Sequence, residues 1–213
     1  MHGFHNLALR IDVSQKSFEI EKIPDSVLKQ TLGGKGLATY LLLKYNPAGV
    51  NPLGPDNHLI FAIGPVTGTA LWGSCRHGVY TKSPLTGTVT DSHHGGWSGA
   101  RLKWAGLDGI VFKGKAKAPV YAIVENGEVT FQPAEDLWGM GVHETVKTLQ
   151  ERHGEKDVSI ICIGQAGEHL VKFANWMNEN DRSSGRGGTG CSEAGGDVAR
   201  RLMGAGRPRR RRA

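Results

Sequence analysis

The sequence repeats one pattern of elements twice. Each copy is predicted to contain a β-hairpin, a loop of the form Leu-x-Gly-x-Gly (residues 32–36 and 137–141), a helix and a short apolar strand that ends in Ile-Gly. The two strand ends, IFAIG at 60–64 and IICIG at 160–164, align one hundred positions apart. Two similar units in one chain usually pack about a pseudo-twofold axis. The repeat therefore predicts an internally duplicated fold, against the alternative that short apolar strands match by coincidence.

The individual elements carry local signals. Apolar and polar residues alternate over 7–13 and again over 18–20, which predicts two strands of a hairpin. An Asn-Gly pair at 126–127 between two strand-like segments predicts a two-residue hairpin turn. Helices are predicted over 37–45, which is apolar on most faces and so largely buried, and over 142–153, which is amphipathic.

Residues 74–99 carry the strongest functional signal. They contain Arg76, two β-prone pieces joined by a compact turn, and then HHGG at 93–96, which is predicted to form a turn just before a helix. A basic side chain, bare backbone N–H groups and a helix start together suit a phosphate or another polyanion. The alternative is a solvated hairpin between two core elements. The second unit offers a comparable arginine-bearing loop, RSSGRGGTG, at 182–190.

Other site motifs are weak in this sequence. GRGGTG at 185–190 has the G-x-G-x-x-G spacing, but it follows a polar loop, whereas a dinucleotide-binding loop follows a buried strand directly. GGKG lacks the Ser or Thr and the spacing of a nucleoside-triphosphate-binding P-loop. Asp91, His93 and His94 could hold a metal ion, but a metal site needs three or four converging ligands, so a polar turn is favoured.

Composition limits the class of protein. The 213 residues are enough for one full core and few for two. The formal charge is +6, but residues 191–213 hold seven arginines against Glu193 and Asp197, so residues 1–190 carry only +1. Three separated cysteines form no C-x-x-C pair, which argues against an iron–sulfur or zinc site built by this chain alone and fits a reducing compartment. No signal peptide or membrane-spanning run is found, so a cytoplasmic location is expected.

Several longer pieces point to a family. In order, the chain contains L-G-G-K-G-L-A, A-I-G-P-V-T-G-T, T-K-S-P-L-T-G, H-H-G-G-W-S-G-A-R-L-K-W-A-G-L-D-G-I-V, D-L-W-G, I-G-Q-A-G-E-H-L-V-K-F-A and N-D-R-S-S-G-R-G-G-T-G. These pieces cover residues 7–190 almost continuously. Together they resemble the N-terminal domain of the tungsten-dependent aldehyde ferredoxin oxidoreductase family. The resemblance implies an α+β domain, internally duplicated, with two β-sheets and flanking helices about a pseudo-twofold axis.

The resemblance also implies a cofactor. In that family the domain cradles two molybdopterin-type pterins whose dithiolenes hold tungsten, or molybdenum in some relatives, and the protein supplies no thiolate ligand to the metal. The positions implied to contact the pterin phosphates are Arg76, His93, Gly95, Arg182, Ser183 and Gly185, with Gly96 in the same loop as Gly95. The family often has Asn where His93 stands, and that Asn helps to hold Mg²⁺ between the phosphates. Because Mg²⁺ prefers oxygen ligands, the imidazole weakens the expectation of a magnesium contact at His93.

The resemblance ends after Gly190. The family continues with A-V-M-G-S-K-N-L-K-A and then two helical domains, which hold the four cysteines of a [4Fe-4S] cluster and the acid/base residues. Here residues 191–213 are rich in Arg, Gly and Ala. We therefore predict a pterin-binding domain over 1–190 and an Arg-rich tail over 191–213 that is disordered or out of frame, in a truncated chain. A basic tail that binds nucleic acid or an acidic partner is the less favoured alternative.

The function implied by the resemblance is that of the pterin-binding portion of a tungsten or molybdenum oxidoreductase. The whole enzyme would oxidise a small aldehyde to the acid and pass two electrons to ferredoxin. Its partners would be ferredoxin, the C-terminal domains or a partner subunit, and copies of itself, with no membrane. The competing class is a binding module that carries the pterin without catalysis. Three expectations follow: Arg76 and Arg182 converge, the face around Trp97 is open and apolar, and this chain alone turns over no aldehyde.

Overall fold

The computed structural model describes residues 1–154, 158–179 and 181–191, and the backbone of 202–205. The first half of the chain contributes six strands and three α-helices. Their bounds are β1 (Leu7–Asp12), β2 (Ser17–Lys22), α1 (Asp25–Thr31), α2 (Gly34–Tyr45), β3 (Leu59–Ile63), β4 (His77–Lys82), β5 (Val89–His94), α3 (Ser98–Trp104) and β6 (Gly109–Lys113).

The second half follows the same plan. Its elements are β7 (Val120–Glu125), β8 (Glu128–Pro133), η1 (Glu135–Leu137), α4 (Val142–His153), β9 (Val158–Cys162), α5 (Gln165–Glu168), β10 (Trp176–Asn178), β11 (Ser183–Ser184), η2 (Thr189–Cys191) and β12 (Leu202–Ala205). The predicted Asn-Gly hairpin joins β7 to β8. Both turn residues have positive φ, 52° at Asn126 and 87° at Gly127, as a turn that follows the twist of its strands requires.

The strand order shows the duplication directly. One sheet has the order β2-β1-β6-β3-β4-β5, and the other β11-β10-β9-β12-β7-β8. If each strand of the first sheet is matched with the strand six places later in the chain, the two orders are the same, read from opposite ends. The pairing directions agree as well: β1–β6 and β7–β12 are parallel, and β3–β6 and β9–β12 are antiparallel. The predicted duplication in an α+β fold with two sheets is therefore confirmed.

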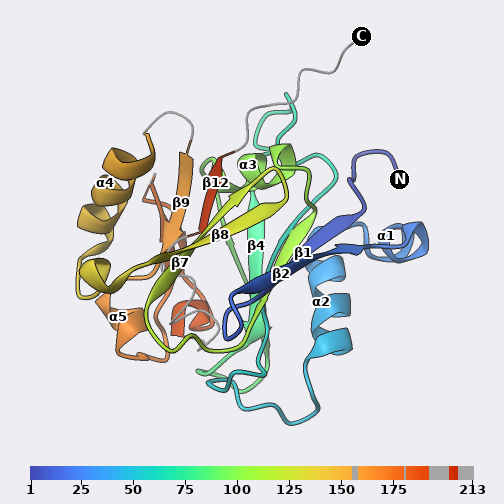
Figure 1. The fold of residues 1–213 in the computed structure, drawn as a ribbon. Helices are drawn as coiled ribbons and strands as arrows, with labels where there is room; N and C mark the ends of the chain where they lie inside the picture. Colours follow the sequence, from blue (N-terminus) through green and yellow to red (C-terminus); the bar gives the residue numbers. More distant parts are fainter. Residues whose placement is uncertain (155–157, 180, 192–201, 206–213) are drawn as a thin grey trace.

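The two sheets form the central layers of a four-layer arrangement (Figure 1). A single core lies between them, with side chains from both sheets, such as Leu9, Phe61, Ile161 and Trp176. The outer face of the first sheet is covered by α1 and α2, and the outer face of the second by α4. Each helix buries one side on its own sheet. The prediction that the helix over 37–45 is largely buried is correct for that side only, because Leu43 on the other side is 78% exposed. Among the described residues, no helix is long and apolar enough to span a bilayer.

The predicted tail contributes a strand. Residues 202–205 form β12, which lies between β7 and β9 and so takes the central place that β6 takes in the first sheet (Figure 1). The prediction of a disordered or out-of-frame tail covered residues 191–213, and it does not hold for Cys191 in η2 or for residues 202–205 in β12. Residues 192–201 and 206–213 lie outside the described residues. The L-M-G-A of β12 shares a Met-Gly pair with the A-V-M-G-S of the family segment, which the sequence analysis overlooked.

Candidate functional site

An open pocket lies where the two halves of the domain meet. Its volume is about 480 Å³, and its walls come from residues about one hundred positions apart in the chain. The lining residues are Gly73, Cys75, Arg76, His93, His94, Gly95, Gly96, Asp181, Arg182 and Ser183. Six of the seven predicted cofactor-binding residues are in this set, and Gly185 is outside it. The expectation that Arg76 and Arg182 converge on one site is confirmed.

The first half supplies its residues from the ends of two paired strands. Arg76 immediately precedes β4, and His93 and His94 are the last residues of β5, with His94 opposite His77 in the antiparallel register. The predicted His-His turn is therefore wrong: the strand continues through both histidines, and the chain turns at Gly95 and Gly96. The helix that follows, α3, has only seven residues, so its dipole adds little and attraction for an anion comes from the arginines and loop amides.

His94 forms the buried floor of the pocket. Its side chain is 1% exposed, and its Nδ1 is hydrogen-bonded to Ser184 Oγ of the second half, while its Nε2 lies 3.4 Å from Ser98 Oγ. The His77 ring packs edge-on against it, with centroids 3.9 Å apart. Burial lowers the pKa of His94 to about 4 and holds the pKa of His77 well below its ordinary value. Both imidazoles are therefore neutral at pH 7.

His93 points to the other side of the strand and is partly exposed. Its Nε2 lies 3.4 Å from Asp91 Oδ2, and the same carboxylate forms an ion pair with Lys35 at 3.0 Å. Among the described residues, no three His, Cys, Asp or Glu side chains are grouped to hold a metal ion. A magnesium contact at His93 would thus need its remaining ligands from a bound molecule, and it stays a prediction.

The second half supplies Asp181, Arg182 and Ser183 from the turn that joins β10 to β11. Asp181 is an acidic residue in a pocket predicted to bind anions, and the sequence analysis did not single it out. Its carboxylate oxygen Oδ1 lies 2.7 Å from Nε2 of His143 in α4. The charged residues that line the pocket are thus two arginines, Arg76 and Arg182, and one carboxylate, Asp181, which contacts His143.

The glycines of GRGGTG have a packing role. A Cβ atom on Gly187 would overlap the Thr90 side chain, and one on Gly188 would overlap the Lys172 carbonyl oxygen. Ser83 Oγ also donates a hydrogen bond to the Gly187 carbonyl at 2.6 Å. Gly187 therefore lets the second half approach the β4–β5 hairpin of the first half closely, and Gly188 lets two segments of the second half pack against each other. The sequence analysis treated both glycines as part of an anion loop, and close packing is what the structure shows.

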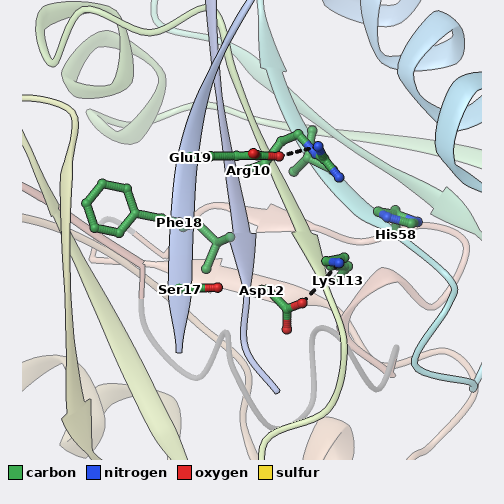
Figure 2. A pocket seen from close by; sticks show the side chains of 9 residues that line it. Arg10, Asp12, Ser17, Phe18, Glu19, His58 and Lys113 are labelled. Atoms are coloured by element: carbon green, nitrogen blue, oxygen red, sulfur yellow. Dashed lines mark hydrogen bonds and ion pairs between the residues drawn. The ribbon is translucent and has the colours of Figure 1, made fainter. Parts of the chain in front are cut away.

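A second pocket, of about 200 Å³, lies on the outer face of the first sheet (Figure 2). Its cations are already paired: Arg10 with Glu19, and Lys113 with Asp12 at 3.0 Å. His58 is largely buried beside them, and this burial lowers its pKa, so the ring is neutral at pH 7. Because the charges of this pocket are compensated within the chain, it has less capacity to attract an ion than the Arg76–Arg182 pocket.

The surface near the Arg76–Arg182 pocket exposes large apolar side chains. Trp97, directly after the Gly95-Gly96 turn, is 51% exposed, and Trp72, next to the lining residue Gly73, is fully exposed together with much of Leu71. This agrees with the expected open face around Trp97. Patches of this kind in soluble proteins usually contact a ligand or another protein surface.

Comparison with known proteins gives consistent matches. Residues 8–206 match the sequence profile described as aldehyde ferredoxin oxidoreductase, N-terminal domain. The chain is 44% identical over 191 residues to the tungsten-containing aldehyde ferredoxin oxidoreductase of Pyrococcus furiosus, covering 90% of this chain and 32% of that protein. It is 35% identical to the WOR-like subunit of an aliphatic sulfonate oxidoreductase of the same organism, covering 90% and 33%.

A solved structure matches nearly the whole fold. The TM-score is 0.91 at 31% identity to a chain of the active site complex BamBC of benzoyl coenzyme A reductase in complex with 1,5 dienoyl-CoA. The match covers 96% of this chain and 31% of that one. The present chain therefore spans about a third of the length of the relatives that it matches.

Proposed function

The chain belongs to the aldehyde ferredoxin oxidoreductase family through its N-terminal domain, and on that premise we propose that it is the pterin-binding part of a tungsten or molybdenum oxidoreductase. The observation that carries the proposal is the pocket in which Arg76 of the first half and Arg182 of the second half meet. Because each of the two equivalent halves brings an arginine to one pocket, the pocket suits a pair of similar anionic ligands. We also propose that the two halves are related by a pseudo-twofold axis.

The residues present fit the phosphate of a pterin cofactor. Guanidinium groups form charge-assisted, two-pronged hydrogen bonds with phosphate oxygens. Backbone amides in the Gly95–Gly96 turn and the Ser183 hydroxyl group can complete the contacts, and a Cβ built on Gly95 meets no atom within 4 Å, so a ligand can approach that backbone closely. When bound, a tungsten or molybdenum pterin would supply the two-electron redox chemistry.

The chain's own residues would bind and orient that cofactor. Arg76 and Arg182 would hold its phosphates, and the turn between β10 and β11 would place Ser183 against them. His94 and His77 are neutral below the pocket, so they add no positive charge and leave the binding of the phosphates to the arginines. The described cysteines, Cys75, Cys162 and Cys191, form no disulfide with one another, and the proposal assigns them no bond to the metal.

The activity of the whole protein is part of the proposal. We propose that an aldehyde is oxidised to the acid and that the electrons pass to ferredoxin; the Pyrococcus furiosus relative is named as an aldehyde ferredoxin oxidoreductase. Other relatives bear the names of an aliphatic sulfonate oxidoreductase and a glyceraldehyde-3-phosphate:ferredoxin oxidoreductase. Relatives that share this domain are thus named for different substrates. We therefore propose that residues outside this domain determine which substrate is bound.

A second candidate is a pterin-binding subunit that works in a hetero-complex. The observation that favours it is that two matching proteins are named as a subunit and as part of an active site complex. In that case a partner polypeptide would provide the iron–sulfur cluster and the acid/base residues. Nucleic-acid binding remains less favoured because the +5 charge lies in residues 191–213 and the body of the chain carries +1.

The proposal can be tested by pterin retention. The 213-residue chain, produced in a host that makes molybdopterin, should copurify with pterin, measured by the fluorescence of the oxidised pterin released on denaturation. The Arg76→Ala/Arg182→Ala double variant should lose most of it. Arg152→Ala is the matched control, because Arg152 pairs with Asp136 and does not line the pocket. A folded chain without pterin, or equal retention by the double variant, would reject the proposal.

A further prediction concerns turnover. We expect no aldehyde-dependent reduction of ferredoxin or viologen by the 213-residue chain alone, even with pterin and tungstate supplied. The described residues provide a cradle and no metal-holding cluster of side chains. Turnover that appears only when a partner subunit is added would favour the second candidate, and turnover by the chain alone would contradict both.

A further inference from the structure

Asn178 lies at the end of β10, at the seam between the two halves, and it contacts both of them. Its side chain is 1% exposed. The side-chain Nδ2 donates a hydrogen bond to the Gly95 carbonyl oxygen at 2.7 Å, and the side-chain Oδ1 accepts one from the Arg182 N–H at 3.0 Å. Gly95 and Arg182 line opposite halves of the same pocket.

The geometry points to Asn178 as a positioning residue that sets the distance between the two halves of the pocket. Its backbone adds to this role: the Asn178 N–H donates to the Arg182 carbonyl, and its carbonyl accepts from the Asp181 N–H, at 3.0 and 3.1 Å. The turn that carries Arg182 is therefore held through Asn178. The bond to Gly95 then ties this turn to the loop of the first half.

Only a side-chain amide of this length can hydrogen-bond both to the Gly95 carbonyl and to the Arg182 N–H. The Gly95 carbonyl can only accept and the Arg182 N–H can only donate, so the group between them must have one donor and one acceptor. Aspartate keeps the acceptor but loses the donor, and it places a carboxylate against a carbonyl. Serine is too short to reach both partners, and glutamine adds a methylene group at a buried site, where extra volume is poorly tolerated.

The nearby His94–Ser184 contact also joins the two halves, between β5 and β11. Asn178 differs because two of its side-chain partners, Gly95 and Arg182, line the pocket from opposite halves. Loss of its amide should therefore have a larger effect on phosphate binding and on the mobility of the two pocket loops than on the unfolding midpoint of the domain. Disruption of one net hydrogen bond typically changes an equilibrium by a few-fold to about tenfold.

The test compares Asn178→Ala and Asn178→Asp with Ser159→Ala. Ser159 is equally buried and donates one side-chain hydrogen bond to Glu179, next to Asn178 in sequence, but it contacts neither pocket loop. The probe is inorganic phosphate, titrated into the ¹⁵N-labelled 213-residue chain. For Asn178→Ala we expect phosphate binding weakened about tenfold and faster amide exchange at Gly95, Gly96, Arg182 and Ser183. For Ser159→Ala we expect both to remain at the wild-type level.

The readouts separate a positioning role from a structural one. If Asn178→Ala and Ser159→Ala lower the unfolding midpoint equally and leave phosphate affinity and loop exchange unchanged, the inference is overturned. It rests on the proposed function only for the nature of the ligand. If the wild-type chain retains no pterin, the proposed function fails, and amide exchange at the two loops still decides the role of Asn178.

Discussion

The two glycine-rich loops of this domain look alike in sequence and differ in structure. In the first loop, residues 93–96, Gly95 lines the pocket, and a Cβ there would meet no atom within 4 Å. In the second loop, residues 182–190, a Cβ on Gly187 would overlap Thr90 of the first half, and one on Gly188 would overlap the Lys172 carbonyl oxygen of the second half. The first loop uses glycine to leave backbone accessible to a ligand, and the second uses it to bring two halves together.

The comparison shows that a duplicated fold need not duplicate the roles of its residues. Each half brings one arginine to the pocket, Arg76 from just before β4 and Arg182 from the second loop, so the charge is shared between the halves. The two halves pack differently. The β4–β5 hairpin of the first half lies against the second loop, whereas β11, the strand of the second half that corresponds to β5, is only two residues long. Substitutions in the two loops should therefore separate effects on stability from effects on anion binding.

The largest expected effect is that of Gly188→Ala. Gly188 has φ of +66°, and its Cβ would overlap the Lys172 carbonyl oxygen, a backbone atom that cannot move alone. We expect a loss of unfolding free energy of more than about 3 kcal/mol, measured by urea denaturation. Gly87→Ala is the control: its φ is +73° but a Cβ there meets nothing within 4 Å, so only the strain of about 1–2 kcal/mol applies. Equal losses in the two variants would contradict the close-packing role.

The next effect concerns the arginines. Arg76→Ala and Arg182→Ala should each weaken binding of inorganic phosphate by about 1.5–3 kcal/mol, roughly ten- to a hundred-fold, since each removes a charge-assisted contact. Isothermal titration calorimetry would measure this, with Arg152→Ala expected to bind as the wild type does. If only one of the two arginines matters, the view that the halves share the charge is wrong.

Acid should destabilise the domain through His94. The pKa of His94 is about 4 in the folded state, against 6.5 for an ordinary histidine, so the unfolded chain takes up a proton first as the pH falls. Stability is therefore complete above about pH 6.5 and declines between 6.5 and 4, by up to about 1.4 kcal/mol per pH unit for this one group. Denaturation midpoints at pH 7, 6 and 5 would show it. His94→Gln should flatten the decline, and an unchanged slope would refute the assignment.

The smallest effect on stability is expected for Gly95→Ala. Gly95 has an ordinary φ and open space around its Cβ position, so the unfolding free energy should change by less than about 0.5 kcal/mol. Phosphate binding should fall by a few-fold, because a methyl group would enter the pocket. A stability loss as large as that of Gly188→Ala would remove the contrast between the two loops.

Much of the fold was accessible from the sequence because its signals are local. Alternation over 7–13, the Asn126-Gly127 pair and the stripe of the 142–153 helix each depend on residues close together in the chain, and each prediction is confirmed. The repeat of Ile-Gly strand ends one hundred residues apart predicted the duplication. The family resemblance implied seven residues as pterin contacts, and all of them except Gly185 line one pocket. Their contact with a pterin stays a prediction.

Only the tertiary structure decided how the halves meet. His94 and His93 are adjacent in the sequence, yet one is buried against Ser184 and the other is partly exposed, because successive residues of a strand face opposite sides. The close approach of Gly187 to Thr90, the bridge at Asn178 and the place of residues 202–205 in the second sheet all depend on partners far away in the chain. Such contacts leave no periodic pattern in the local sequence, so they become visible only when the chain has folded.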